Sequence, residues 1–184
     1  MYQETPSPAN ANGFAFNEHV ADWLKRMTPS ESDNITRYAV TLTLDVESMH
    51  RKCRGGVLEA DEKVSFAKTT FSAFRWKLDR TILRSAASKH GRELTYVPVI
   101  EGQSSGHRIH YHCVIVTPTW VTLPDMRAAV KHAWSRTEFG AHQVDVQPMR
   151  DDGWLRYMSK EAWTLTRDVV DIDNVRLSTC PVRC

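Results

Sequence analysis

Two stretches of the chain have the composition of β-strands and are separated by a short polar loop, and this pattern constrains the fold more than any other. Residues 94–101 and 108–118 are rich in β-branched and apolar side chains, whereas the loop of residues 102–107 contains two glycines and two serines. Strands joined by so short a loop pair antiparallel as a hairpin. The sequence therefore predicts an antiparallel sheet built around this hairpin.

Two further strands and the helices that cover the sheet follow from the same kind of pattern. Residues 37–46 alternate and are rich in β-branched side chains, and residues 141–149 form a fourth predicted strand. Helical spacing of apolar residues, with an Asp151 cap before the last segment, predicts helices over residues 14–27, 59–89, 122–136 and about 153–163. The order of these elements predicts an α+β fold, an antiparallel sheet of split βαβ (ferredoxin-like) topology with helices packed on it.

Length and composition favour one globular domain. With 184 residues, the chain suits a single domain over residues 14–163, after a polar, disordered lead-in of residues 1–13 and before a tail of residues 164–184 whose role the sequence does not indicate. No run approaches the roughly 18 apolar residues that a membrane span needs, which argues against a membrane partner. The cysteines are too scattered for a disulfide framework, so we expect a reducing, cytoplasmic location. They are Cys53, Cys113, Cys180 and Cys184.

The distribution of charge is more informative than the formal net charge of +2. Eight basic residues lie between Lys63 and Arg92, opposed by Asp79 alone. Such a segment can track phosphates, with Arg75, Lys77 and Arg80 as candidate contacts, or it can form a solvated helix face. Since the chain has no glycine-rich loop ending in Gly-Lys-Ser or Gly-Lys-Thr, we expect a strand-separating helicase to be another chain.

Two histidines on the second hairpin strand are candidate metal ligands. His110 and His112 are two residues apart, so their side chains point to one face of the sheet. Glu101 precedes His110 by nine residues and pairs directly with it if the turn is centred between residues 105 and 106. A register shift by one residue would move the carboxylate to the opposite face. Two imidazoles and one carboxylate leave open coordination positions, as a catalytic metal requires.

A tyrosine on the last predicted helix is a candidate nucleophile. Tyr157 and Lys160 are three residues apart and share a helix face. A phenol is a poor nucleophile at neutral pH, but a nearby metal ion and an ammonium group favour the phenolate and stabilise charge on a phosphate. Tryptophans such as Trp154 can stack on unpaired bases or belong to the core. The others considered for stacking are Trp76, Trp120, Trp134 and Trp163, of which Trp134 is expected in the core.

In combination, these motifs resemble the HUH endonuclease superfamily. The histidine pair followed by Tyr157-Met-Ser-Lys160 is similar to its replication-initiator (Rep) branch, in which the histidines precede the tyrosine. Thr41-Leu-Thr43 resembles the first motif of that branch. The resemblance spans residues 38–161 and implies a single-tyrosine enzyme, because the helix carries no second tyrosine.

The resemblance implies a reaction and its participants. Tyr157 would cut single-stranded or hairpin DNA at a replication origin, forming a 5′-phosphotyrosine link and a 3′-hydroxyl that primes rolling-circle synthesis of a phage, plasmid or related element. Mg²⁺ or Mn²⁺ would be held by Glu101, His110 and His112, and Lys160 would assist at the phosphate. Thr41 and Thr43 would lie near the DNA, and a separate helicase and polymerase would act on it.

Two other functions fit the same residues. A single-tyrosine transposase of the same superfamily shares the chemistry but recognises transposon ends. A non-catalytic nucleic-acid-binding module would use the histidines and the tyrosine only for stacking and hydrogen bonding. Formation of a covalent adduct on DNA separates this module from the two enzymes.

Overall fold

The computed structural model describes residues 19–30, 34–53, 58–102, 109–159 and 169–178. Within these ranges four strands form one sheet in the order β2-β3-β1-β4, and every neighbouring pair is antiparallel. This is the strand order of the split βαβ arrangement, and it confirms the predicted α+β class. The strands are β1 (Ile35–Leu44), β2 (Thr95–Glu101), β3 (His110–Pro118) and β4 (Gly140–Pro148).

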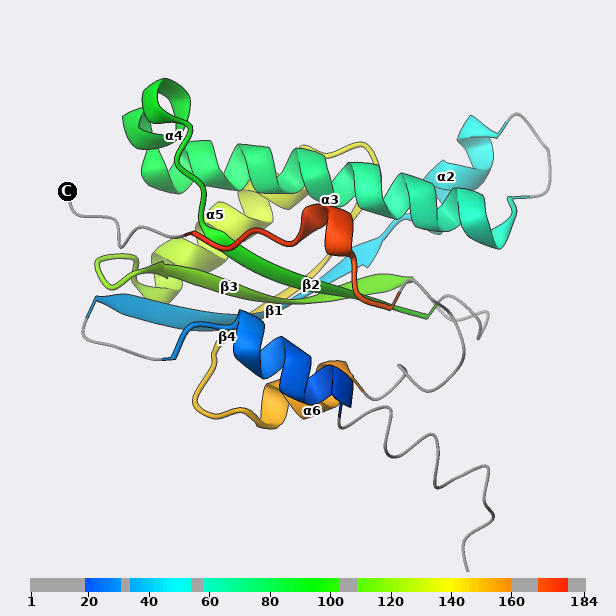
Figure 1. The fold of residues 1–184 in the computed structure, drawn as a ribbon. Coiled ribbons are helices and arrows are strands. Elements are labelled where there is room, and N and C mark those ends of the chain that lie inside the picture. The colour runs from blue at the N-terminus through cyan, green and yellow to red at the C-terminus, as the bar shows by residue number, and fades with distance from the viewer. Residues whose placement is uncertain (1–18, 31–33, 54–57, 103–108, 160–168, 179–184) are drawn as a thin grey trace, which may run out of the picture.

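Helices cover both faces of the sheet (Figure 1). The long helix α3 (Ala60–Leu83) and α5 (Leu123–Ser135) lie on one face, where they share a core with alternate residues of the strands such as Leu42 and Tyr111. A helix over residues 19–27 and α6 (Gly153–Met158) lie on the other face. There a smaller core joins them to the intervening strand residues, including Val99 and Val114. Strands β1, β2 and β3 are therefore largely buried from both sides, whereas β4 is more exposed. Alternation along each strand assigns its side chains to one of the two faces.

The predicted helix over residues 59–89 is two helices. α3 ends at Leu83, Arg84 takes a φ of 50°, and α4 continues over Ser85–His90. Residues 85–90 offer no large apolar side chain, and only Ala86 and Ala87 pack against the core, so the chain has little packing to keep it on the axis of α3 beyond Leu83. A positive φ at a non-glycine residue is unfavourable. Packing of the Leu83 side chain and the change of chain direction towards β2 therefore outweigh the preference of Arg84 for a negative φ.

A short helix also replaces the predicted end of the first strand. α2 (Val46–Lys52) begins directly after β1, because Asp45 caps it by accepting hydrogen bonds from the backbone N–H and the hydroxyl of Ser48 at 3.0 and 2.5 Å. Met49 from this helix is fully buried. The strand prediction through Val46 therefore ran two residues too far.

Residues 169–178 cover the β2 edge of the sheet. Arg176 and Tyr96 exchange two backbone hydrogen bonds of 2.8 and 3.0 Å, and Val170 bridges to Val99 of β2. The short 3-10 helix η1 (Ile172–Asn174) lies between these bridges and contacts α3. An exposed edge strand would invite pairing with another chain, so this segment blunts the edge.

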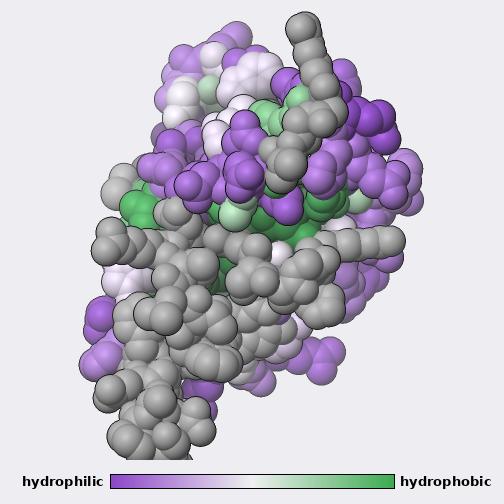
Figure 2. All heavy atoms as spheres, turned by 90° about the vertical axis from the view of Figure 1, so that its right-hand side faces the viewer, coloured by the Kyte–Doolittle hydropathy of each residue, from purple (hydrophilic) through white to green (hydrophobic). Residues whose placement is uncertain are grey.

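The described surface carries no sign of a membrane span. None of the helices that the structure describes is long and apolar enough to cross a bilayer. Figure 2 shows mainly hydrophilic side chains over the helical layer, with hydrophobic residues visible beneath them in the middle of that face. The predicted lead-in, residues 160–168 and residues 179–184 lie outside the described residues.

Asp79 ties α3 to β2 from a buried position. Its Oδ1 atom accepts hydrogen bonds from the Leu94 backbone N–H at 2.9 Å and from the Tyr96 hydroxyl at 2.8 Å. Burial raises the pKa of the Asp79 carboxyl from its ordinary value of 3.8 to about 6, although both hydrogen bonds act in the opposite direction. Because the folded-state pKa is raised, the carboxyl stabilises the fold most at low pH, and this contribution is lost as the pH rises through about 6.

We predict that Asp79→Asn is more stable than the parent at pH 7.5, with an advantage that shrinks towards pH 4. The amide oxygen can still accept both hydrogen bonds, while the desolvated charge, which is worth about 3 kcal/mol, is removed. Urea unfolding at several pH values measures the difference, with Asp61→Asn, exposed on the same helix, as the control. A difference that does not change with pH would contradict the assignment.

Candidate metal centre and tyrosine site

The register of three strands brings the predicted metal ligands to one place. Glu101 of β2 pairs directly with His110 of β3, as the hairpin loop predicted. His112 pairs with Thr41 of β1, and His110 with Thr43. All these side chains point to the face that α6 covers, since they share the alternation of that core.

The ligand atoms of this cluster converge on a common point. Glu101 Oε2 lies 2.5 Å from His112 Nε2 and 3.3 Å from His110 Nε2, and the two Nε2 atoms are 3.2 Å apart. Ligands that bind one ion at about 2.0–2.2 Å at right angles lie about 3 Å from each other. Glu101 and His112 are buried, and a buried carboxylate needs a compensating positive charge. Both spacing and burial therefore fit a divalent cation between these side chains.

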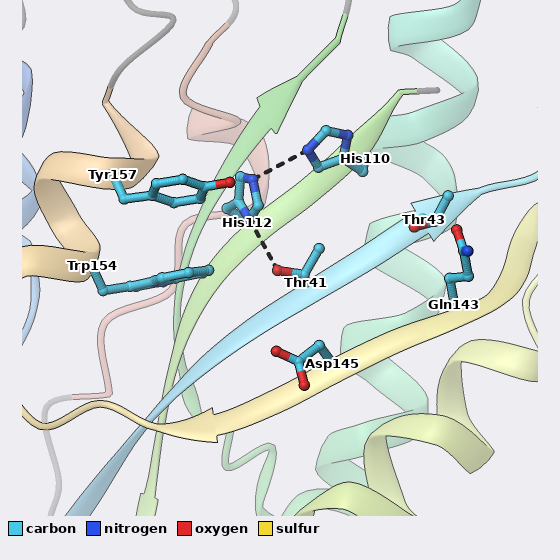
Figure 3. Close-up of a pocket in the computed structure, with 8 residues that line it drawn as sticks. All are labelled: Thr41, Thr43, His110, His112, Gln143, Asp145, Trp154 and Tyr157. Carbon is cyan, nitrogen blue, oxygen red and sulfur yellow. Dashed lines mark hydrogen bonds between the residues drawn. The ribbon is translucent and has the colours of Figure 1, made fainter. Parts of the chain in front are cut away.

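The orientation of His112 is fixed by its neighbours. Its Nδ1 atom lies 3.1 Å from Thr41 Oγ1, and its ring meets the edge of Trp154 at a centroid distance of 5.2 Å (Figure 3). When Nδ1–H donates to the threonine hydroxyl, the lone pair is on Nε2 and faces Glu101 and His110. Thr41 was predicted as a DNA contact, and in the structure its hydroxyl lies within hydrogen-bonding distance of His112.

Tyr157 extends from α6 towards the histidines. Its ring lies 5.1 Å from the ring of His112 and stacks on Trp154 at 5.2 Å with an interplanar angle of 23°. Figure 3 shows its hydroxyl directed towards His112. The tyrosine remains 45% exposed, whereas Leu155 and Met158 of the same helix are buried. The Tyr157 side chain is thus partly exposed to solvent beside the cluster of Glu101, His110 and His112.

Aspartates hold the start of α6 against the sheet. Asp151 was predicted as the cap, but Asp152 takes the N-cap position without a side-chain capping bond, and Asp151 Oδ1 accepts a hydrogen bond from the Gly153 backbone N–H at 2.8 Å. Asp152 pairs with Lys25 at 2.9 Å and with Arg37 of β1 at 3.5 Å. The hydrogen bond from Lys25, followed by the charges of both basic residues, lowers the pKa of the Asp152 carboxyl. These contacts set the position from which Tyr157 approaches the cluster.

An open cleft of about 530 Å³ joins the metal cluster to the tyrosine. Its floor includes Gln143 and Asp145 of β4, which the sequence interpretation did not consider. Alternation could have revealed them, because polar residues at positions 143, 145 and 147 share the face of Thr41. A second hollow of about 400 Å³ shares Asp145, Trp154 and Tyr157 with the first and extends to Arg150. The paired rings of Trp154 and Tyr157 therefore border both hollows.

The other predicted contacts lie elsewhere. Arg75 is buried and forms an ion pair with Glu93 at 2.6 Å, so it is not available to a phosphate and that expectation is corrected. Lys77 and Arg80 lie on α3, on the opposite side of the sheet from the cluster. Their contact with DNA stays a prediction. Lys160 and Trp163 lie outside the described residues, while Trp134 is fully buried as predicted.

Comparison with known proteins adds one finding to this geometry. The model of a family of replication-associated proteins, designated ORF2, matches residues 37–162. The match covers β1 to α6 and so includes the metal cluster, both threonines and Tyr157. The searches of curated proteins and of solved structures gave no match.

We predict that His110→Ala and His112→Ala each abolish Mn²⁺ binding without unfolding the chain, because each leaves two of three converging ligands. Isothermal titration calorimetry measures binding, and circular dichroism measures the fold. His142→Ala, which removes an exposed histidine of β4, is the matched control and should bind as the parent does. Unchanged affinity in Glu101→Gln would remove Glu101 from the site, and unfolding of the histidine variants would assign the imidazoles to the core.

A second prediction concerns Thr41. Thr41→Val retains the shape of the side chain but removes the partner of His112 Nδ1, so we expect Mn²⁺ affinity to fall about tenfold. Thr43→Val is the control, because the Thr43 side chain also lines the cleft but has no hydrogen bond to a described residue. Equal affinities of the two variants would contradict an orienting role for Thr41.

Proposed function

Because the chain belongs to this ORF2 family of replication-associated proteins, we propose that it initiates replication by nicking one DNA strand with Tyr157. The proposal places it among the single-tyrosine HUH endonucleases. The observation that carries it is the proximity of an exposed tyrosine ring to a metal-ligand cluster, 5.1 Å from ring to ring at His112. A phenol so close to a cation site is suited to attack a phosphate held there.

The proposed step is a transesterification. The Tyr157 hydroxyl loses its proton, and its oxygen bonds to phosphorus. The bond from phosphorus to the 3′-oxygen breaks, and that oxygen takes up a proton to become a free 3′-hydroxyl. One phosphodiester replaces another, so the 5′-phosphotyrosine retains the bond energy and the reverse reaction can rejoin the strand without ATP.

Each side chain has a part in this step. Glu101, His110 and His112 would hold a divalent cation, which would supply Lewis-acid chemistry at the scissile phosphate. Thr41 keeps His112 in the ligating orientation. Stacking on Trp154 restricts the ring of Tyr157 to the edge of the cleft. Lys160 follows Tyr157 by three residues. We assign its ammonium group the role of stabilising the negative charge on the phosphate in the transition state.

The two hollows at the paired rings favour a single strand as the substrate. Trp154 and Tyr157 border both of them, so one nucleotide can lie on each side of the scissile phosphate. Aromatic faces stack on unpaired bases whatever their sequence, and Arg150 at the far end is suited to a backbone phosphate. Separation of the duplex and synthesis from the 3′-hydroxyl are then left to a helicase and a polymerase.

The donor set favours Mn²⁺ over Mg²⁺. Mg²⁺ prefers an all-oxygen shell and retains its waters, whereas two imidazoles and one carboxylate suit a softer ion. We therefore use Mn²⁺ as the probe of activity.

Adduct formation tests the proposal. The full chain with Mn²⁺ is incubated with a pool of random single-stranded oligonucleotides labelled at the 3′ end, and the products are separated under denaturing conditions. The 3′ label should travel with the protein, because the new 5′ end is the one linked to tyrosine. A separate 5′-labelled pool should yield shortened strands that a polymerase can extend.

We predict that Tyr157→Phe forms no adduct, a loss of at least about a thousandfold, because it lacks the attacking oxygen. Mass spectrometry of the linked peptide identifies the residue. Trp120→Ala, which alters an aromatic residue 50% exposed outside the cleft, should form as much adduct as the parent. Undiminished adduct with Tyr157→Phe would show that another residue is the nucleophile, and no adduct with either protein would reject nicking.

A further inference from the structure

A second aromatic surface lies on the face of the molecule opposite the metal cluster. Trp76 of α3 is 53% exposed, although most large apolar residues of that helix are buried under it. About half of this residue faces solvent, so burial in the core does not account for a tryptophan at this position. Its environment instead has the composition of a binding site, since a hollow of about 230 Å³ adjoins it between α3 and α5.

Positive charge surrounds this indole. The guanidinium carbon of Arg80 lies 3.9 Å from the centre of the Trp76 ring, and the Lys77 ammonium lies 5.6 Å from it. From α5, Arg136 Nη1 lies 3.2 Å from His132 Nε2 in the same hollow. We call these five residues the Trp76 platform.

No acidic group offsets this charge within the described part of the chain. None of the residues lining the hollow is acidic, and no ion pair with another described residue engages Lys77, Arg80 or Arg136. The nearest acid on α3 is Asp79, which is buried and hydrogen-bonded to β2. Cations beside a stacking surface with no counter-charge attract an anionic ligand that has flat rings.

We propose that the Trp76 platform binds single-stranded DNA outside the catalytic cleft. One base stacks on the exposed part of the Trp76 indole, and the flanking phosphates contact Lys77, Arg80 and Arg136. This inference rests on the proposed function, because it takes the bound strand to be part of the DNA that the cleft holds. An acidic peptide would satisfy the charges but would leave the indole without a flat partner, so DNA fits the platform better.

The position of the platform predicts a dependence on DNA length. The sheet lies between α3 and the metal cluster, so a strand in the cleft must pass around the molecule to reach Trp76. A short oligonucleotide fills the cleft alone, whereas a longer one can engage both sites. Cooperation between two linked sites would raise affinity for the longer strand only.

The experiment compares two lengths of DNA on chains that cannot cut it. In a Tyr157→Phe background with Mn²⁺, fluorescence anisotropy measures the Kd for random single strands of about 8 and about 30 nucleotides, within and well above the usual site size of a single-strand groove. We expect Trp76→Ala to weaken binding of the longer strand about tenfold, the effect of losing one stacked base, and to leave the shorter strand unchanged. Trp120→Ala is the matched control and should change neither, because Trp120 is similarly exposed but no cation of the described residues lies over its ring.

Salt dependence gives an independent readout of the phosphate contacts. Arg80→Gln should reduce the slope of log Kd against log salt by about 0.7 for the longer strand. Unchanged binding of the longer strand by Trp76→Ala, or an equal loss for both lengths, would overturn the proposal. If Arg80→Gln lost binding to a polyglutamate peptide while its affinity for DNA stayed unchanged, the proposal would be overturned in favour of an acidic partner. Failure of the nicking proposal is distinguishable from this outcome. In that case the chain that retains Tyr157 would form no adduct, while the dependence of binding on DNA length would persist.

Discussion

Glu101 lies directly opposite His110 across the β2–β3 pair, and the Glu101–His110–His112 cluster, which could hold a metal ion, forms only because this register is maintained. A slip by one residue would turn every side chain of β2 to the other face. The two cores prevent this slip, because β2 and β3 are buried on both faces. Val97 and Val99 enter the core under α6, while Tyr96 and Ile100 enter the core under α3. Apolar packing on both sides of the sheet therefore stabilises the relative positions of Glu101, His110 and His112.

Hydroxyl groups on the far face reinforce the same strands. Tyr111 stands between the two histidines on β3, and its hydroxyl donates to buried Asp171 at 2.8 Å. Tyr96 of β2 donates in the same way to Asp79 of α3. Burial raises the pKa of both carboxyls. Tyr96 and Tyr111 thus bind α3 and the segment of residues 169–178 to β2 and β3, the strands that carry the cluster. The cluster itself lies on the opposite face of these strands.

The sheet and the convergence of Glu101, His110 and His112 were predictable from the sequence, whereas the surroundings of this cluster were not. Alternation and the length of one loop were enough for the β2–β3 register, because a two-residue period leaves few alternatives. α2 was missed because Val46 continues the pattern of a strand, and only the local cap at Asp45 ends it. Arg75 looked like part of a basic surface, but a run of charges does not tell which of its members turns towards a core. Gln143 and Asp145 entered the cleft only once β4 was paired with β1.

Tyr157, the proposed nucleophile, and the candidate metal ligands have opposite structural settings, and the proposed chemistry explains the contrast. The ligands lie on strands at the centre of the fold, where a cation needs fixed distances. Tyr157 lies on the six-residue helix α6, which is too short to be stable alone and depends on buried Leu155 and Met158 and on the ion pairs of Asp152. A residue that becomes joined to a DNA strand must leave room for it. An exposed position on a small peripheral helix provides that room, while its buried side chains return the hydroxyl to the same place beside His112.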